Sequence, residues 1–184
     1  MADRFVSVGI LLLAIMLSGL TFYVLTSRQQ LAISIYPRLS IRIVSIVSGQ
    51  PTTVSAIGPV SGIGMPGGVL ASTRYLQDGA NGLYPLYTND RSGLIHVESR
   101  VVRSYTLGDF FEVWGQPLGP TQTLTLKQNG TSQGALFIKD FFWDMCLVNP
   151  GAPSSSEYVS FEWGTHVLRD GEIIDLVYSP VGCA

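Results

Sequence analysis

Charged side chains are scarce in this chain of 184 residues: they make up 13% of it, with 11 Lys and Arg against 13 Asp and Glu. Nucleic-acid-binding domains usually carry a basic face, so this balance argues against a nucleic-acid partner. The chain has two histidines and two cysteines, whereas a zinc centre needs three or four ligands. No G-x-S-x-G, H-E-x-x-H or P-loop motif occurs in it. These absences predict a protein that is not an enzyme and that holds no cofactor.

Charge is missing altogether from the first part of the chain, between Phe5 and Ser27. At 1.5 Å per residue this stretch forms a helix of about 34 Å, and a bilayer core is roughly 30 Å thick. Backbone groups in lipid must bond internally, which favours a helix. We therefore expect a transmembrane anchor at 1–27, a tether at 28–38 and one globular domain at 39–184, with membrane lipid as a partner.

A cleaved signal peptide is the alternative for the same segment. Signal peptides have an apolar stretch of about 7 to 15 residues that ends in a small-x-small cleavage site. The apolar stretch here is longer. The candidate cleavage points Gly19 and Ser27 have Leu17 and Leu25 at the −3 position, which favours an uncleaved anchor.

Three features place the domain outside the cytoplasm. Only four residues precede the apolar stretch, so nearly the whole protein lies on one side of it. Cys146 and Cys183 are an even pair, and a disulfide closing their loop contributes about 4 kcal/mol in the chain-entropy model; two unpaired buried thiols are the alternative. Asn129–Thr131 is an N-glycosylation sequon. The arginines around the stretch, one before it and three soon after, favour the opposite orientation.

Short runs of β-branched and aromatic residues, separated by turn residues, predict strands in the domain. One helix is expected at Thr106–Gly115, because Thr106 and Asp109 have capping-box spacing and Gly115 suits a helix end. This pattern predicts an α+β, β-rich fold, a β-grasp-like mixed sheet with a single packed helix, and a β-sandwich is the alternative. The expected strands are Ile41–Val47, Thr52–Ile57, Leu83–Thr88, Leu94–Ser99, Thr123–Gln128, Ala135–Phe141, Tyr158–Trp163 and Ile173–Tyr178.

The middle of the domain resembles a family of small exported bacterial and archaeal proteins of uncharacterised function. The similar motifs are Ser-Gly-Leu-Ile-His-Val-Glu-Ser at Ser92–Ser99 and Thr-Leu-Gly-x-Phe-Phe-x-Val-Trp-Gly at Thr106–Gly115, with a weaker likeness at Leu168–Ile174. The family has His-Thr-His-Asp where this chain has Tyr87–Asp90, and a further histidine-rich run where it has Ser40–Ile43. The resemblance implies an extracytoplasmic domain in which most of that histidine set is replaced.

The candidate site residues are few. His96 and Glu98 are two apart on a predicted strand and so share one face, with Asp90 close in sequence; these three are weak candidates for a metal site. The alternative is that His96 only makes structural hydrogen bonds. The run Phe141–Trp143 is expected in the core or, because aromatic residues are enriched in interfaces, at a contact with a partner.

The predicted function is that of a non-catalytic structural or accessory subunit of a membrane or cell-surface assembly. The anchor holds it in the membrane, and the domain packs against other subunits or copies of itself outside the cytoplasm. A pilin-like surface filament subunit and a degenerate metal- or small-ligand-binding module are the two alternatives.

Overall fold

The computed structural model describes residues 14–19, 21, 30–127, 141–153 and 156–183. Within the predicted anchor, residues 14–19 and 21 are helical, and the greater part of this segment lies outside the described residues. In the part of the chain that the structure describes, no helix combines the length and the apolar character needed to cross a bilayer.

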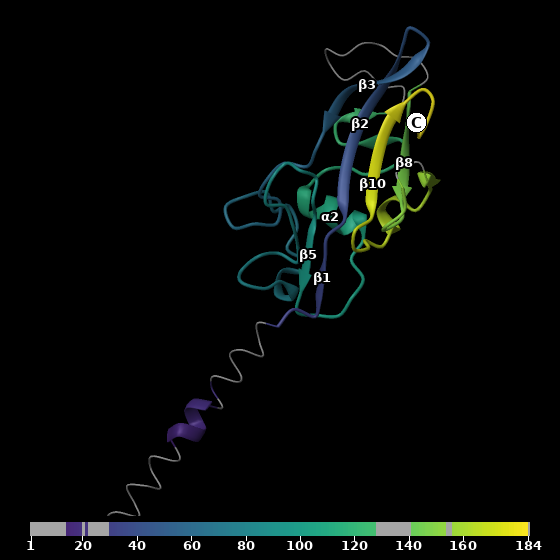
Figure 1. Cartoon of the computed structure of the whole chain (residues 1–184). Coiled ribbons are helices and arrows are strands. Elements are labelled where there is room, and N and C mark those ends of the chain that lie inside the picture. The colour runs from purple at the N-terminus through teal and green to yellow at the C-terminus, as the bar shows by residue number, and fades with distance from the viewer. Residues whose placement is uncertain (1–13, 20, 22–29, 128–140, 154–155, 184) are drawn as a thin grey trace, which may run out of the picture.

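A five-stranded mixed sheet forms the larger part of the domain (Figure 1). Its strands, in spatial order, are β3 (Gln50–Ile57), β2 (Arg38–Val47), β10 (Ile173–Ser179), β8 (Phe142–Val148) and β9 (Tyr158–Ser160). β2 and β10 are parallel, and the other neighbouring pairs are antiparallel. The strands predicted for β2, β3 and β10 are therefore confirmed to within a few residues at each end.

A tight turn joins β2 to β3. Ser48 and Gly49 are the two residues between the strands, and both have positive φ, 53° and 80°. Positive φ at both central positions is what a two-residue hairpin requires, because such a turn follows the right-handed twist of the strands. This hairpin forms the end of the domain away from β1 in Figure 1.

A second, three-stranded sheet lies beside the first, in the order β1 (Ile33–Ile35), β5 (His96–Ser99) and β4 (Leu86–Tyr87). β4 and β5 are shorter than the predicted runs. β1 falls within the segment that the sequence assigns to the tether. It is a strand because Ile33 and Ile35 alternate with polar residues and pack on the core.

After the N-terminal segment, the described residues contain one α-helix, α2 (Leu107–Trp114). The Thr106 side chain accepts from the backbone N–H of Asp109, and the Asp109 carboxylate accepts from the N–H of Thr106. Gly115 ends the helix with φ 71°. The predicted helix and its capping box are confirmed.

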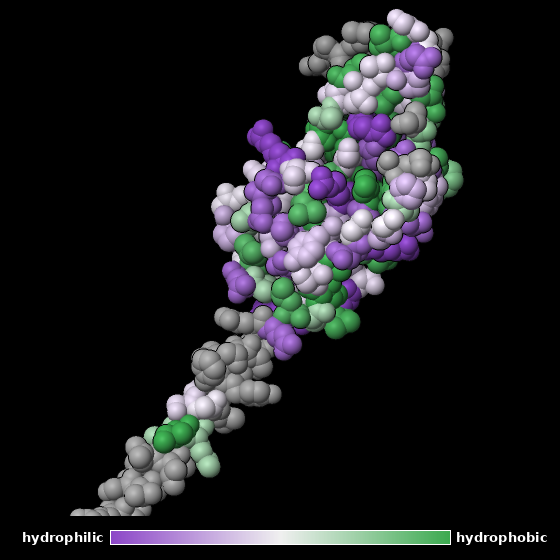
Figure 2. All heavy atoms as spheres, in the orientation of Figure 1, coloured by the Kyte–Doolittle hydropathy of each residue, from purple (hydrophilic) through white to green (hydrophobic). Residues whose placement is uncertain are grey.

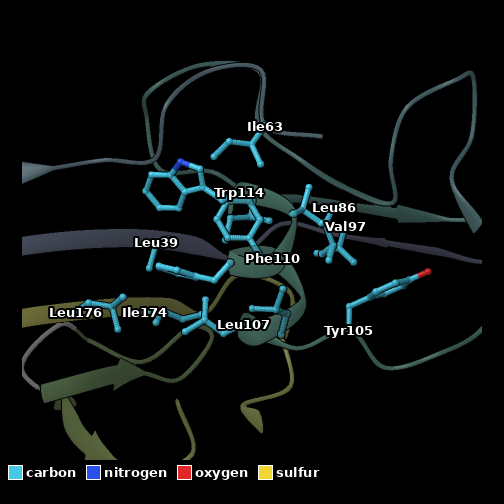
Figure 3. Packing of buried hydrophobic residues seen from close by; sticks show 14 of the residues in the cluster. Leu39, Ile63, Leu86, Val97, Tyr105, Leu107, Phe110, Trp114, Ile174 and Leu176 are labelled. Atoms are coloured by element: carbon cyan, nitrogen blue, oxygen red, sulfur yellow. The ribbon is translucent and has the colours of Figure 1, made fainter. Parts of the chain in front are cut away.

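The hydrophobic core lies where α2 meets both sheets. Side chains of Leu107, Phe110 and Trp114 pack towards Leu39 of β2 and Leu176 of β10 (Figure 3). On the other side they meet residues near β4 and β5. Two one-turn 3-10 helices, η1 (76–78) and η3 (163–165), border this core. The fold is thus α+β and strand-rich, with mixed sheets and few helices.

The region between α2 and β8 differs from the prediction. A small hairpin of β6 (Gln122–Thr123) and β7 (Leu126–Lys127) replaces one long strand, because Leu124 adopts a positive φ of 54° between them. The predicted strand at 135–141 lies almost wholly outside the described residues. β8, which begins at Phe142, was not predicted as a strand.

Candidate functional site

His96, Glu98 and three neighbours from other segments form one polar and aromatic cluster, which we call the His96 cluster: Tyr36, Tyr87, Asn89, His96 and Glu98. Strand pairing brings them together, since Tyr87 of β4 lies opposite His96 of β5. The Tyr87 ring stacks on the imidazole with ring centroids 4.7 Å apart, and the Tyr36 ring meets it edge-on at 5.3 Å. Both rings thus cover the histidine, which is half-buried.

Glu98 organises the hydroxyl groups of the cluster. The Tyr36 hydroxyl donates to Glu98 Oε1 at 3.0 Å, and the Tyr87 hydroxyl donates to Oε2 at 2.8 Å. Burial and the adjacent Glu98 carboxylate both raise the pKa of Tyr87 well above its ordinary value. Tyr87 therefore stays a protonated donor, and each oxygen of the carboxylate receives one tyrosine hydrogen bond.

The imidazole of His96 is bonded on one side only. Its Nε2 lies 3.1 Å from Asn89 Nδ2. With the amide nitrogen as donor, Nε2 accepts and the neutral ring carries its proton on Nδ1. His96 Nδ1 is buried and makes no hydrogen bond with the described residues. The Oε1 of Glu98, 3.9 Å away, is too far for one.

Asp90, the third predicted candidate, is engaged in its own loop. Its Oδ1 accepts from the backbone N–H of Ser92 at 2.9 Å, an Asx-turn contact. Hydrogen bonding with the Ser92 side chain, and next with this N–H, lowers the pKa of Asp90. Among the described residues, no three His, Cys, Asp or Glu side chains are arranged to hold a metal ion. The structure therefore brings His96 and Glu98 together without assembling a ligand set around them.

Tyr36 links the cluster to strand β1 and to the turn that precedes β10. Its backbone N–H donates to Asp170 Oδ1 at 2.8 Å, and its hydroxyl lies 2.7 Å from Ser34 Oγ. The sequence offered no signal for Tyr36, which falls in the predicted tether. Tyr87 and Asn89 were visible only as replacements for family histidines.

A second histidine, His166, is fully buried between two carboxylates. Its Nδ1 lies 2.8 Å from Glu162 Oε2, and its Nε2 lies 3.0 Å from Glu172 Oε2. Burial by itself lowers the pKa of His166, but hydrogen bonds to Glu172 and Glu162 outweigh it and raise the pKa overall. Glu172 is buried as well, and its other oxygen accepts from the N–H of Arg169. The group joins η3 to the start of β10.

An ion pair lies on the sheet face opposite α2. The Arg42 guanidinium of β2 bonds to Asp175 Oδ2 of the neighbouring strand β10, and it lies 3.6 Å from Glu157 Oε1. Burial raises the pKa of Asp175 although Arg42 acts in the opposite direction. Because parallel pairing sets these residues on adjacent strands, the pair fixes the β2–β10 register.

The remaining predicted residues are spread over the domain. Cys146 and Cys183 lie at disulfide distance, with Cα atoms 5.8 Å apart. Phe141 and Trp143 are buried against Tyr178, while Phe142 is half-buried. The sequon at 129–131 lies outside the described residues.

One open cleft of about 240 Å³ lies between the edges of β2 and β3 and the loop before β5. Arg91 is the only ionisable side chain among its lining residues, which are otherwise small or apolar.

Neither the protein-family models, nor the curated proteins, nor the solved structures contain a match to this chain.

Proposed function

We propose that this protein is a non-catalytic, membrane-anchored structural or accessory subunit whose domain lies outside the cytoplasm. The observation that carries the proposal is how the His96 cluster uses its polar groups. Both oxygens of Glu98 and the Tyr36 hydroxyl are occupied in joining β1, β4 and β5. The His96 cluster thus serves to hold β1, the strand that follows the proposed anchor, against β4 and β5.

A β-grasp-like arrangement is the finer fold that we propose for the larger sheet. Its support is the spatial order β3-β2-β10-β8, in which an N-terminal hairpin lies beside the last strand and the first and last strands are parallel. The helix α2 comes between the two halves in sequence and packs on one face. In this sheet β9, which pairs with β8, is an edge strand.

That edge strand, β9, is where we propose that a partner subunit or a second copy binds. Tyr158 and Val159 of β9 are about 41% exposed, and the adjoining Phe161 is 84% exposed. Exposed edge strands pair readily with other chains, and apolar side chains beside them add buried area. The half-buried Phe142, on neighbouring β8, lies in the same sheet.

Isolation of the native protein tests both parts of this proposal. It should remain with the membrane pellet through alkaline carbonate washing, and mild detergent should release it together with other chains or as an oligomer. Phe161→Ser should reduce this association with an unchanged melting temperature. Val54→Ser, an exposed valine on the opposite edge strand β3, is the matched control and should leave it unaltered. Recovery in the soluble fraction as a monomer would refute the proposal.

A metal- or small-ligand-binding module is the second candidate. His96 Nδ1 favours its small-ligand form, because this buried N–H has no hydrogen-bond acceptor among the described residues. Metal analysis of the purified protein, with His96→Ala as the control, tests the metal form. Metal content that is absent, or equal in the variant, excludes a metal site at His96.

A pilin-like filament subunit is the remaining alternative from the sequence. Mass spectrometry of the mature N-terminus separates it from an anchored subunit, because a chain that still begins at Met1 has not been processed as pilins are.

A further inference from the structure

We infer that one end of the domain rests on the membrane and binds anionic phospholipid headgroups. We call this end the base surface, and it consists of Leu76, Arg100, Val101, Val102 and Arg103. The inference deepens the proposed function, because it depends on residues 5–27 being a transmembrane anchor.

Chain length places the base surface near the bilayer. The N–H of Ala32 donates to the carbonyl oxygen of Ser99 at 2.7 Å, which fixes the start of the domain beside the residue that precedes Arg100. Ala32 follows Ser27, the end of the charge-free stretch, by five positions in the chain. Even fully extended, the chain between them reaches only about 17 Å. The headgroup layer adds several ångströms on each side of the hydrocarbon, so the base surface lies within or next to it.

The side chains on this surface are unusually apolar for an exposed loop. Val102 is 81% exposed, Val101 44% and Leu76 48%. Hydrophobic and hydrophilic residues lie side by side at the end of the domain that the N-terminal segment joins (Figure 2). Apolar side chains that a domain holds at the depth of the headgroups lower their free energy by inserting into the boundary between headgroups and acyl chains.

Backbone contacts hold the parts of this surface together. The N–H of Arg100 donates to the carbonyl of Asp78 at 2.8 Å, and an Arg100 guanidinium nitrogen donates to the carbonyl of Gln77 at 3.3 Å. Ser99 Oγ also bonds to the Asp78 carbonyl. The turn η1, which begins at Leu76, is thereby fixed against the loop that carries both valines.

Arginines at the edge of the surface fit phosphate groups. Arg103 Nη1 lies 2.8 Å from Asp78 Oδ2, and its guanidinium stacks over the Tyr75 ring at 4.3 Å. Arg74 lies over the same ring at 4.9 Å, but it already forms ion pairs with Glu112 and Asp109. A guanidinium has five N–H donors, so one bond to Asp78 leaves Arg103 further donors for a phosphate oxygen. Both ionisable residues of the base surface are arginines, and Asp78, which offsets the charge of Arg103, is buried.

The test uses the full-length protein in vesicles with an environment-sensitive fluorophore on a cysteine introduced as Val102→Cys. The vesicles are made of phosphatidylcholine with or without phosphatidylglycerol and contain lipids with a shallow spin-label quencher. The matched control is Val47→Cys, about half exposed, at the end of β2 and about 30 Å along the strand from its start. Unmodified protein reports any labelling of the native cysteines.

We expect the probe at residue 102 to be blue-shifted and quenched several-fold more than the probe at 47, and more strongly in anionic vesicles. Arg100→Gln with Arg103→Gln should weaken the dependence on anionic lipid by about 5-fold per arginine. The double variant also removes the contact between Arg103 and Asp78, which could change the fold. Omission of the anionic lipid therefore tests the binding of anionic headgroups in protein whose fold is unchanged.

Three outcomes overturn parts of the reasoning, and they are distinguishable. Equal quenching at 102 and 47 in protein that floats with the vesicles refutes the base surface and leaves the anchor standing. Equal quenching at 102 with and without phosphatidylglycerol refutes the binding of anionic headgroups. Protein that does not float with the vesicles refutes the proposed anchor itself.

Discussion

Three acidic residues and one histidine hold separate segments of this domain together. Glu98 accepts from tyrosines on two other segments, and His166 lies between Glu162 and Glu172. A buried polar group that lacks a hydrogen-bond partner lowers the stability of the fold. Removing one member of such a group therefore costs more than the lost hydrogen bond, because its partner remains buried without one. Changes at these residues should therefore act on stability.

Glu98→Gln should lower the free energy of unfolding by about 1 to 2 kcal/mol. The glutamine has the same size, but its amide offers one acceptor oxygen, so one of the Tyr36 and Tyr87 hydroxyls loses its acceptor. Urea unfolding of the full-length protein in detergent measures the change. Glu112→Gln, at an exposed ion pair with Arg74, is the control and should cost less than about 1 kcal/mol. Equal losses of unfolding free energy in the two variants would contradict the proposed role of Glu98 in holding the three strands together.

Stability should depend on pH through His166. Its folded pKa is raised above the ordinary value near 6.5, so the folded state binds this proton more tightly than the unfolded state. The stabilisation is complete below the unfolded pKa and is lost as pH rises through the folded pKa. His166→Gln removes the titration. The difference in unfolding free energy between wild type and variant should thus be largest below about pH 6.5 and should shrink as the pH rises above that value. A difference that stays constant with pH would contradict this role of His166.

At the scale of elements, the close approach of α2 to η3 depends on two glycines. Of the two, Gly108 is the one that the contact requires: a Cβ built on it lies 2.5 Å from the carbonyl oxygen of Gly164, closer than side chains tolerate, whereas a Cβ on Gly164 lies 3.7 Å from Gly108. The neighbouring N–H of Leu107 donates to the carbonyl of His166 at 2.8 Å. The helix therefore packs backbone against backbone at its first turn.

Gly108→Ala should lower the free energy of unfolding by roughly 1 to 3 kcal/mol, because the backbone of one element must move. The alanine favours the helix intrinsically, so a loss identifies the tight contact as the cause. Gly119→Ala, whose Cβ meets nothing closer than 3.8 Å, is the control and should change little. Thermal unfolding followed by circular dichroism compares the two, and a stabilised Gly108 variant would show that η3 yields easily.

Several elements were predictable from the sequence and others were not. The capping box at Thr106 is a local pattern, and α2 forms where it predicts. β1 was missed because three residues carry little periodicity and are ordered by β5, more than sixty residues later in the chain. β8 was missed because its Asp144 breaks the apolar run, and pairing with β10 rather than local propensity makes it a strand.

At the scale of the whole molecule, the C-terminus is held to the sheet by its cysteine. Cys146 of β8 is buried, and with Val44 and Val177 it forms a small apolar cluster against which Cys183 packs. The two cysteines are 37 residues apart, so their bond joins the end of the chain to a central strand.

Replacing both cysteines by alanine should lower the free energy of unfolding by about 4 kcal/mol, mostly by releasing the unfolded chain from its cross-link. Reductant should destabilise the wild type to a similar extent and leave the double variant unaffected. Urea unfolding with and without reductant measures both effects. Alkylation of both thiols in denatured, unreduced native protein would contradict this pairing.

By itself the sequence determined what depends on neighbouring residues: the charge-free N-terminal stretch, the capped helix, the first hairpin and the presence of two cysteines. Only the tertiary structure decided that β2 lies parallel to β10 and that Tyr36 reaches Glu98. The physical reason is range. Caps, turns and alternation involve residues a few positions apart, whereas these contacts join segments that meet only after the core between α2 and the sheets has formed.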